Sequence, residues 1–221
     1  MRGKFITFEG GEGSGKSTHA GALAERLRAL GYDVVLTREP GGSAGAEIIR
    51  HIILSGLAKP LGAETETILF AAARADHVRM TIEPALAAGK WVICDRFIDS
   101  TRVYQGALGK VDMKLIRGLE RVTVGAAMPD LTFILDVPAN IGLARAKSRR
   151  GAANADRFES EAVEFHEDLR RAFLVLAERE PKRVVVIDGR APRDVVAERI
   201  AAAVDERLLA EPVQAVESAM S

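Results

Sequence analysis

The sequence contains a single cysteine, a single tryptophan and only two tyrosines, and its charges cancel. The lone Cys94 cannot form an intramolecular disulfide or a cysteine-based zinc cluster, so we expect a protein of the reducing cytoplasm. The 31 Lys and Arg residues are matched by 31 Asp and Glu residues. Because nucleic acids and acidic lipids attract proteins with a basic excess, this balance argues against either as a partner. Any anionic ligand must therefore be bound by charge that is gathered locally.

Long apolar segments are also missing. No run of about 18 apolar residues occurs, so the sequence predicts no membrane span, and residues 1–9 lack the apolar stretch of a signal peptide. The length of 221 residues favours one domain over two. We therefore expect a single domain over residues 1–210, followed by a C-terminal tail over 211–221.

Short apolar runs alternate with segments of helical periodicity along the chain. The apolar runs lie at residues 5–8, 34–37, 91–94, 131–137 and 184–187, and the helical segments at 17–30, 43–56, 65–88, 112–126, 138–148, 159–179 and 192–209. Apolar runs without strict polar alternation are typical of strands that are buried on both faces of a parallel sheet. The pattern predicts a three-layer α/β fold, in which a mostly parallel central sheet of about five strands is flanked by helices. Ligands of such sheets bind beyond the carboxyl ends of the strands, where this sequence places charged residues.

A phosphate-binding loop follows the first apolar run. Residues 10–17 read GGEGSGKS, which matches G-x-x-x-x-G-K-[ST] between a predicted strand and a predicted helix. The glycines allow backbone N–H groups to surround a polyphosphate, while Lys16 is expected to reach the β- and γ-phosphates and Ser17 to bind Mg²⁺. The predicted ATP site consists of Gly10, Gly11, Glu12, Gly13, Ser14, Gly15, Lys16, Ser17 and Thr18. The expected fold is therefore that of a P-loop NTPase.

A P-loop alone leaves open how the nucleotide is used. The sequence lacks the Asn/Thr-Lys-x-Asp element that reads guanine in GTPases, and it is short for a motor ATPase. A kinase needs a second pocket, rich in arginine, for a phosphorylated acceptor. A binding switch, whose nucleotide changes its affinity for a partner, needs no acceptor pocket.

The helix predicted over residues 65–88 is one candidate wall of an acceptor pocket. Its apolar stripe, interpreted as core, consists of Ile68, Ala72, Ala75, Ile82 and Leu86. Phe70 and Arg74 fall on the opposite face, which suits a flat base stacked on the ring with guanidinium donors at its edge. Periodicity alone favours a helix that is buried on two faces, with Phe70 as a filler. His77 is expected to be a surface or interface histidine.

Charged residues in three further segments complete the candidate pocket. Residues 37–42 (TREPGG) place an Arg-Glu pair and a tight turn after the second strand, although an ordinary turn with a surface salt bridge would look the same. Asp95 ends the third strand and is a candidate Mg²⁺ ligand beside Ser17, and Arg96 can bridge two phosphates. Thr101 and Gln105 are one helical turn apart. The basic cluster that begins at Arg145 leads into a small-residue segment and predicts a lid over 145–157.

Together these segments resemble thymidylate kinases of the bacterial type. The resemblance rests on residues 8–18, the TREPGG segment, Phe70 with Arg74, the Asp95–Arg96 pair and residues 100–106 (STRVYQG), and it extends from about residue 4 to 199. It implies transfer of the ATP γ-phosphate to dTMP, giving dTDP for DNA precursor synthesis, with Mg²⁺ and a homodimer. The nearest alternative is a P-loop kinase for another nucleoside monophosphate or for a deoxynucleoside.

The resemblance also implies roles for individual residues. Phe70 would stack on thymine with Arg74 at its edge, and Tyr104 would exclude a ribose 2′-OH. Glu9 would lie near the sugar 3′-OH and the metal. The implied dTMP site comprises Glu9, Arg38, Pro40, Arg50, Phe70, Arg74, Arg96, Thr101, Tyr104 and Gln105. The variable positions of the P-loop hold no arginine, which in this family places the catalytic arginine in the lid, so the implied catalytic set is Lys16, Arg96, Glu9 and Arg149 or Arg150.

Overall fold

A five-stranded, all-parallel sheet forms the centre of the molecule. The computed structural model describes residues 2–149, the backbone of Arg150, Phe158 and residues 161–209. The strands are β1 (Phe5–Glu9), β2 (Val34–Arg38), β3 (Trp91–Asp95), β4 (Leu131–Asp136) and β5 (Val184–Asp188), in the spatial order β2-β3-β1-β4-β5. Every predicted apolar run is a strand, and the predicted fold class is confirmed. Each strand ends at a charged residue, so these charges gather at one edge of the sheet.

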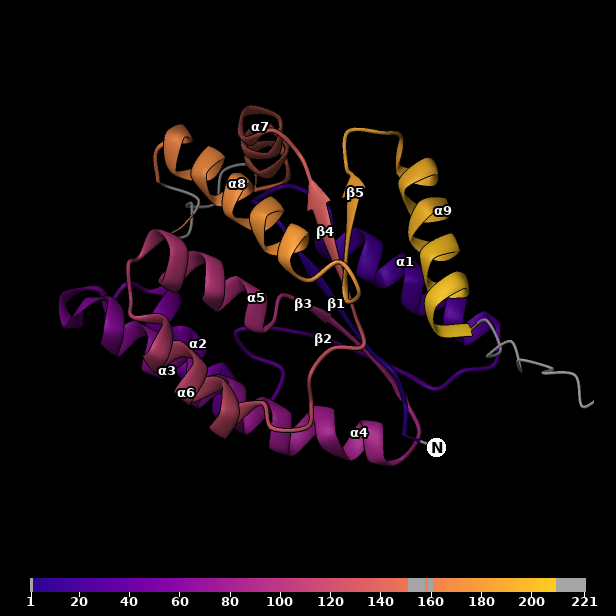
Figure 1. The fold of residues 1–221 in the computed structure, drawn as a ribbon, viewed down its shortest axis with the longest axis horizontal. Helices are drawn as coiled ribbons and strands as arrows, with labels where there is room; N and C mark the ends of the chain where they lie inside the picture. Colours follow the sequence, from indigo (N-terminus) through magenta and orange to yellow (C-terminus); the bar gives the residue numbers. More distant parts are fainter. Residues whose placement is uncertain (1, 151–157, 159–160, 210–221) are drawn as a thin grey trace, which may run out of the picture.

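Two helices cover one face of the sheet (Figure 1). These are α1 (Lys16–Ala29) and α9 (Arg193–Val204), and α9 continues as a π-helical segment, η4 (Asp205–Leu209). Leu23 and Leu27 of α1 and Ile200 of α9 pack with Phe8 and Phe133 of the sheet in one apolar cluster. The apolar spacing that predicts these helices therefore corresponds to their buried faces.

The opposite face carries more helices, in two tiers. The inner tier consists of η2 (Val78–Ile82), α4 (Glu83–Ala87), α5 (Ile98–Thr101), η3 (Arg102–Leu108) and α8 (Val163–Arg179). Farther out lie α2 (Ala44–Leu54), η1 (Lys59–Leu61), α3 (Gly62–His77) and α6 (Met113–Thr123) (Figure 1). Residues 98–108 are helical although no helix is predicted there from periodicity. None of the helices within the described ranges combines the length and apolar character needed to cross a membrane.

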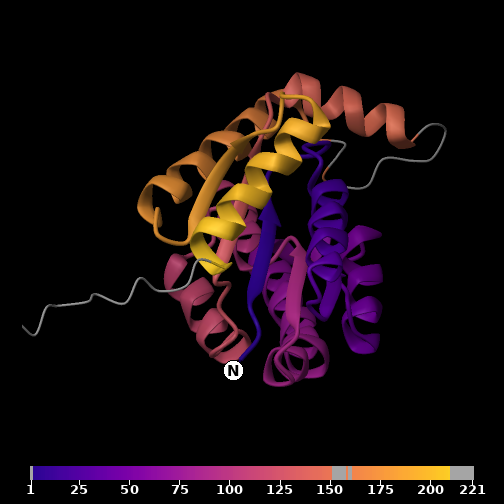
Figure 2. The same ribbon diagram turned by 90° about the vertical axis from the view of Figure 1, so that its right-hand side faces the viewer.

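The P-loop packs against α7 (Ala139–Arg150), the helix that leads towards the predicted lid and extends beyond the tip of β4 (Figures 1 and 2). The two backbones touch through glycines. A Cβ atom added to Gly13 would lie 1.9 Å from the Gly142 carbonyl oxygen, and one added to Gly142 would lie 2.3 Å from the Glu12 carbonyl oxygen. Gly13 also has a positive φ of 65°, which favours glycine. Both positions therefore require the absence of a side chain.

The helix predicted over 65–88 differs most from expectation. It is three elements, α3, the π-helical η2 and α4, and the predicted stripe is wrong in its first half, where Ile68 and Ala72 are exposed. Ile82, the last residue of η2, and Leu86 of α4 are buried as predicted. The wider turn of a π-helix changes which face of the chain meets the sheet. Before that turn, α3 buries polar side chains, because this part of the helix borders the candidate active site.

Candidate active site

A cavity of about 250 Å³ lies at the carboxyl ends of β1, β2 and β3. The structure brings most of the predicted site residues to its wall. Those lining it are Glu12, Gly15, Lys16, Ser17, Arg38, Pro40, Arg50, Phe70, Arg74, Asp95, Arg96, Thr101, Tyr104, Gln105 and Arg149. One lysine and five arginines face three carboxylates there, those of Glu12, Glu39 and Asp95. The neutral chain thus concentrates cations in one place, as local binding of an anion requires.

The phosphate loop is shaped by glycines in left-handed conformations. Gly10, Gly13 and Gly15 have φ values of 129°, 65° and 97°. The Lys16 ammonium group lies over the loop and donates to the carbonyl oxygens of Gly10 at 3.2 Å and Gly11 at 2.8 Å. Burial, reinforced by the nearby Arg96 guanidinium, lowers the pKa of Lys16 to about 8. A negatively charged phosphate at this loop would favour the protonated lysine.

Ser17 and Asp95 form the candidate Mg²⁺ site. Ser17 is the second residue of α1, and its hydroxyl donates a hydrogen bond to the Asp95 carboxylate at the end of β3. Both are hard oxygen ligands, which Mg²⁺ prefers together with water and phosphate oxygens. Their adjacency at the mouth of the P-loop fits a metal that is bound mainly through the nucleotide.

Arg96 links the phosphate loop to the rest of the cavity. It adopts a left-handed backbone conformation, with φ 69°, and its guanidinium pairs with the Glu12 carboxylate and donates to the Gly10 carbonyl oxygen at 3.2 Å. Its charge also lies 5.3 Å from the centroid of the Tyr104 ring. Burial alone would raise the pKa of Glu12, but Arg96 and Lys16 together lower it to about 2. Glu12 is therefore ionised and partly neutralises the phosphate end of the cavity.

A buried ion pair forms the far end of the cavity. Arg74 Nε donates to Glu39 Oε2 at 2.8 Å, and Arg74 Nη2 donates to Thr101 Oγ1 at 3.1 Å. The other oxygen of Glu39 lies 3.1 Å from Nδ1 of His77, whose Nε2 lies 2.8 Å from Thr37 Oγ1. The expectation that His77 lies at the surface is wrong, because its side chain is completely buried. The group instead fixes the orientation of Arg74.

The base-contact candidates lie around Arg74. Thr101 and Gln105 are on successive turns of the α5–η3 helix, and Gln105 Nε2 donates to Glu66 Oε1 at 3.3 Å. Phe70 of α3 lines the cavity, with its ring centroid 6.5 Å from that of Phe158. A half-buried aromatic ring facing polar groups offers a stacking surface with hydrogen-bonding groups at its edge.

Arg38 and Arg50, two further cations of the cavity wall, bond residues in and after the turn that follows β2. Arg38 pairs with Glu47 at 2.9 Å, and Arg50 donates to the Pro40 carbonyl oxygen. Arg149, which belongs to the predicted lid, is part of α7 and lines the cavity. Its positive charge helps to lower the pKa of Glu12. The Arg150 side chain and residues 151–157 lie outside the described residues. Phe158 packs on Tyr104, with ring centroids 5.4 Å apart.

Glu9, which the resemblance would put near the sugar 3′-OH and the metal, is not among the residues that line the cavity. Its carboxylate is fully buried beneath the cavity and accepts hydrogen bonds from the backbone N–H groups of Phe97 at 2.8 Å and Ser100 at 3.2 Å. The Ser100 hydroxyl donates to its other oxygen at 2.6 Å. Burial, and to a smaller extent the charge of the neighbouring Asp99 carboxylate, raises the pKa of Glu9 to about 7. In this arrangement Glu9 orients the turn that carries Arg96 into α5.

The raised pKa of Glu9 predicts a pH-dependent stability. The folded state holds the proton of this group up to about pH 7, whereas the unfolded state releases it near the ordinary value of 4.5, so the Glu9 contribution to stability falls as pH rises between the two values. Glu9→Gln mimics the protonated form. Relative to wild type, we expect the unfolding free energy of Glu9→Gln to increase by a few kcal/mol between pH 5 and pH 8. Urea unfolding at both pH values measures this difference, and a constant difference would contradict the assignment.

Sequence reasoning missed several residues of the site. Glu39 lies inside the TREPGG segment but receives no role there, because its partners Arg74 and His77 are 35 and 38 positions away. Glu66 and Phe158 were likewise not singled out. The sequence offers one signal for Glu39: it lies between Arg38 and Pro40, both of which are predicted acceptor-site residues.

The fold and the loop define the class of the protein. A parallel sheet, a P-loop at the end of β1 and an arginine-rich second pocket are the features of a P-loop phosphotransferase. The thymidylate kinase family model matches residues 8–200, and the chain belongs to this family. The known reaction of the family is phosphorylation of dTMP to dTDP.

Curated proteins and a solved structure agree with the family. Proteins named thymidylate kinase from Bradyrhizobium sp. and Rhodopseudomonas palustris are 60% and 59% identical to this chain, over 94% and 99% of its length and 92% and 95% of theirs. The crystal structure of a thymidylate kinase from Ehrlichia chaffeensis superposes with a TM-score of 0.73. It is 35% identical and covers 92% of this chain and 99% of its own.

Proposed function

We propose that this chain transfers the γ-phosphate of ATP to dTMP, with Mg²⁺ bound to the nucleotide, and that the cavity is where the two substrates meet. The supporting observation is the arrangement within that cavity. Lys16, Arg96 and the group of Phe70, Arg74 and Gln105 all line it. Lys16 bonds the phosphate loop, and Arg74 of the Phe70–Arg74–Gln105 group bonds Thr101. Arg96 bonds both Gly10 of the loop and Ser100, the neighbour of Thr101, so it lies between the two ends. A phosphorylated nucleoside placed with its base at the far end would direct its phosphate towards the P-loop.

The reaction needs positioning and charge compensation from this chain. The acceptor phosphate is already largely ionised at neutral pH, because its second pKa is about 6, so no strong general base is required. One of its oxygens attacks the γ-phosphorus in line with the departing ADP oxygen. Lys16 and Arg96 offset the charge that spreads over the transferred group, and Arg149 adds a cation from α7. In this proposal Arg38 and Arg50, which line the cavity, hold the acceptor phosphate.

Ser17 and Asp95 would hold Mg²⁺ directly or through its water shell. When bound, the ion supplies positive charge to the β- and γ-phosphates. The hydroxyl–carboxylate hydrogen bond between these two residues keeps both oxygens at the mouth of the loop.

An ADP-release assay with a panel of acceptors tests the proposed substrate. With ATP and Mg²⁺, we expect rapid turnover with dTMP, slower turnover with dUMP, and little with dCMP, AMP or thymidine. A preference for another monophosphate would retain the kinase class and overturn the acceptor. Hydrolysis of ATP that does not depend on any acceptor would favour a binding switch.

We extend the proposal to a homodimer in the cytoplasm. Apolar side chains are exposed on three neighbouring helices: Ile48 on α2 at 68%, Ile68 on α3 at 48% and Val122 on α6 at 84%. Exposed apolar side chains that gather on neighbouring helices can mark an association surface, and a second copy of the chain is the occupant proposed here. Sedimentation should show a dimer that Val122→Asp converts to a monomer. The buried free thiol of Cys94 suits a reducing compartment, which cell fractionation tests.

A further inference from the structure

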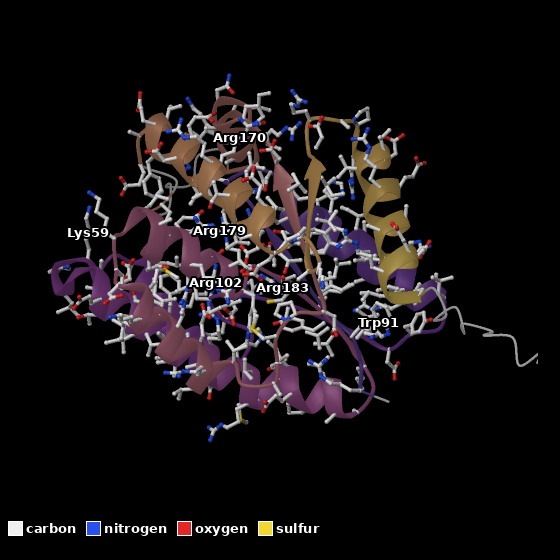
Figure 3. All side chains as sticks on the ribbon, in the orientation of Figure 1. Lys59, Trp91, Arg102, Arg170, Arg179 and Arg183 are labelled. Atoms are coloured by element: carbon white, nitrogen blue, oxygen red, sulfur yellow. The ribbon has the colours of Figure 1, made fainter. Side chains whose placement is uncertain are left out.

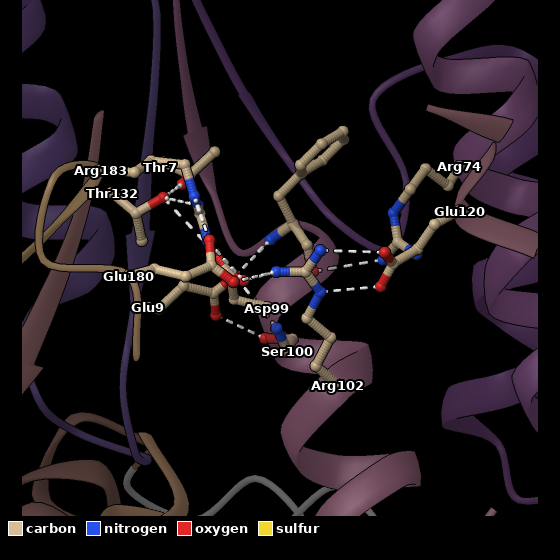
Figure 4. Close-up of polar contacts among 11 residues, drawn as sticks. Thr7, Glu9, Arg74, Asp99, Ser100, Arg102, Glu120, Thr132, Glu180 and Arg183 are labelled. Carbon is tan, nitrogen blue, oxygen red and sulfur yellow. Dashed lines mark hydrogen bonds and ion pairs between the residues drawn. The ribbon is translucent and has the colours of Figure 1, made fainter. Parts of the chain in front are cut away.

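A cluster of ion pairs around one buried carboxylate lies next to the cavity, and its members are not among the residues that line it (Figure 4). At its centre is Asp99 of α5, whose side chain is fully buried. Arg183 donates hydrogen bonds to this carboxylate from two nitrogens, at 2.7 and 2.9 Å, and Arg102 donates a third at 3.1 Å. Two parallel N–H···O bonds from one guanidinium restrict the orientation of a carboxylate as well as its position.

The cluster joins parts of the fold that are distant in sequence. Arg183 directly precedes β5 and also donates to Thr132 Oγ1 of β4 at 2.7 Å, and Thr132 in turn bonds Thr7 of β1 at 2.6 Å. Arg102 pairs with both oxygens of Glu120 on α6, at 2.8 and 2.9 Å, and with Glu180 at the end of α8. Figure 3 labels Arg102 and Arg183 near the middle of the view and Lys59 at its left edge.

The anchored residue is the immediate neighbour of the cavity wall. Asp99 precedes Ser100 and Thr101, both of which line the cavity, and Gln105 follows one turn later. Ser100 itself donates two hydrogen bonds to the carboxylate of Glu9, from its backbone N–H group and from its hydroxyl. The short helix α5 is therefore fastened at one point to β1 and at another to the β4–β5 side of the sheet. The wall that presents Thr101 and Gln105 has little freedom to shift.

Stability alone does not account for such a cluster. The cost of removing charges from water offsets much of the attraction between buried ions, and apolar residues of similar size often stabilise a core as well or better. Directional contacts to one carboxylate, by contrast, fix a backbone segment in a defined place.

We propose that Arg183, acting through Asp99, is a positioning residue that sets the place of Thr101 and Gln105 and so determines the affinity for the acceptor nucleotide. The inference rests on the proposed function, in which these two side chains contact the base of dTMP. Arg183 itself does not line the cavity in which the two substrates are proposed to bind. Its removal should therefore weaken acceptor binding more than ATP binding, since the bonds given for Arg183 go to Asp99, Thr132 and Glu180 and none goes to the P-loop.

Steady-state kinetics of Arg183→Met test the proposal. We expect the KM for dTMP to rise about 10-fold or more, while the KM for ATP changes less than about 2-fold, because small displacements of substrate-positioning groups have large effects. The double variant Asp99→Asn/Arg183→Met removes both charges of this contact. It should show the same increase in the KM for dTMP as Arg183→Met, and it should be more stable than that single variant. Arg183→Lys keeps the charge but cannot donate two parallel hydrogen bonds to the Asp99 carboxylate, so we expect a KM for dTMP between those of wild type and Arg183→Met.

Arg171→Met is the matched control, because it removes an exposed Arg–Asp ion pair with Asp168 on α8. It should leave both KM values unchanged. An unchanged KM for dTMP in the folded Arg183 variants would overturn the inference, and so would an equal rise of both KM values. A wild-type protein that does not phosphorylate dTMP would instead overturn the proposed function, so the two failures are distinguishable.

Discussion

Replacement of Lys16 by alanine is expected to lower turnover by about 10²-fold or more while the protein remains folded. The lysine is the cation that lies over the phosphate loop, held by the carbonyl oxygens of Gly10 and Gly11. In the reaction it offsets negative charge on the β- and γ-phosphates as the bond to the transferred group breaks. An alanine leaves the loop intact but removes this charge from the place where it is needed.

The measurement is kcat with saturating ATP and dTMP, accompanied by thermal melting. Lys182→Ala, at an exposed position before β5, is the control and should behave as wild type. Lys16→Met, which keeps most of the apolar stem, should be as inactive as the alanine variant, because the effect arises from the charge. Near-normal turnover of either Lys16 variant would contradict the assignment of the loop.

Loss of Arg96 is the second large effect we expect. Arg96→Met should reduce kcat/KM for dTMP by about 10²- to 10³-fold, since the variant lacks the cation between the two ends of the cavity. The substitution also leaves Glu12 without its ion-pair partner, and an unpaired carboxylate would repel incoming phosphates. Kinetics of the single variant cannot separate these two causes.

The double variant Glu12→Gln/Arg96→Met separates them. If Arg96 serves only to neutralise Glu12, removal of both charges restores activity. If Arg96 acts on the phosphates, as proposed, the double variant stays within about 10-fold of the single variant. Arg28→Met, which breaks an exposed pair with Glu25, provides the control for loss of an arginine.

The elements that the sequence predicts well are those governed by local chemistry. Strands buried on both faces need continuous apolar runs, so β1 and β3 could be located to within a residue or so. The P-loop also depends on local chemistry. The positive φ values of Gly10, Gly13 and Gly15 favour glycine, so the conformation of the loop is visible in the sequence as a glycine motif. Hence the fold class and the nucleotide end of the site could be predicted.

What could not be predicted depends on contacts between distant residues. In α3 the helical periodicity assigns Ile68 to the core, but this part of the helix borders a polar cavity, so Arg74 and His77 are buried instead. Asp99 and Arg183 are 84 positions apart, and nothing in the spacing of either indicates the other. The hydrogen bonds of Glu9 could not be predicted for the same reason, because its partners lie in a turn more than 80 residues later.

The contact between Gly13 and Gly142 restricts how this enzyme can be redesigned. A P-loop taken from a relative can be grafted here only if it carries glycine at position 13, and a new α7 only if it carries glycine at position 142, since any Cβ atom would meet backbone oxygen. The two segments therefore have to be exchanged as one module. Because Arg149 belongs to the same helix, such an exchange would also transfer the cation that α7 contributes to the cavity.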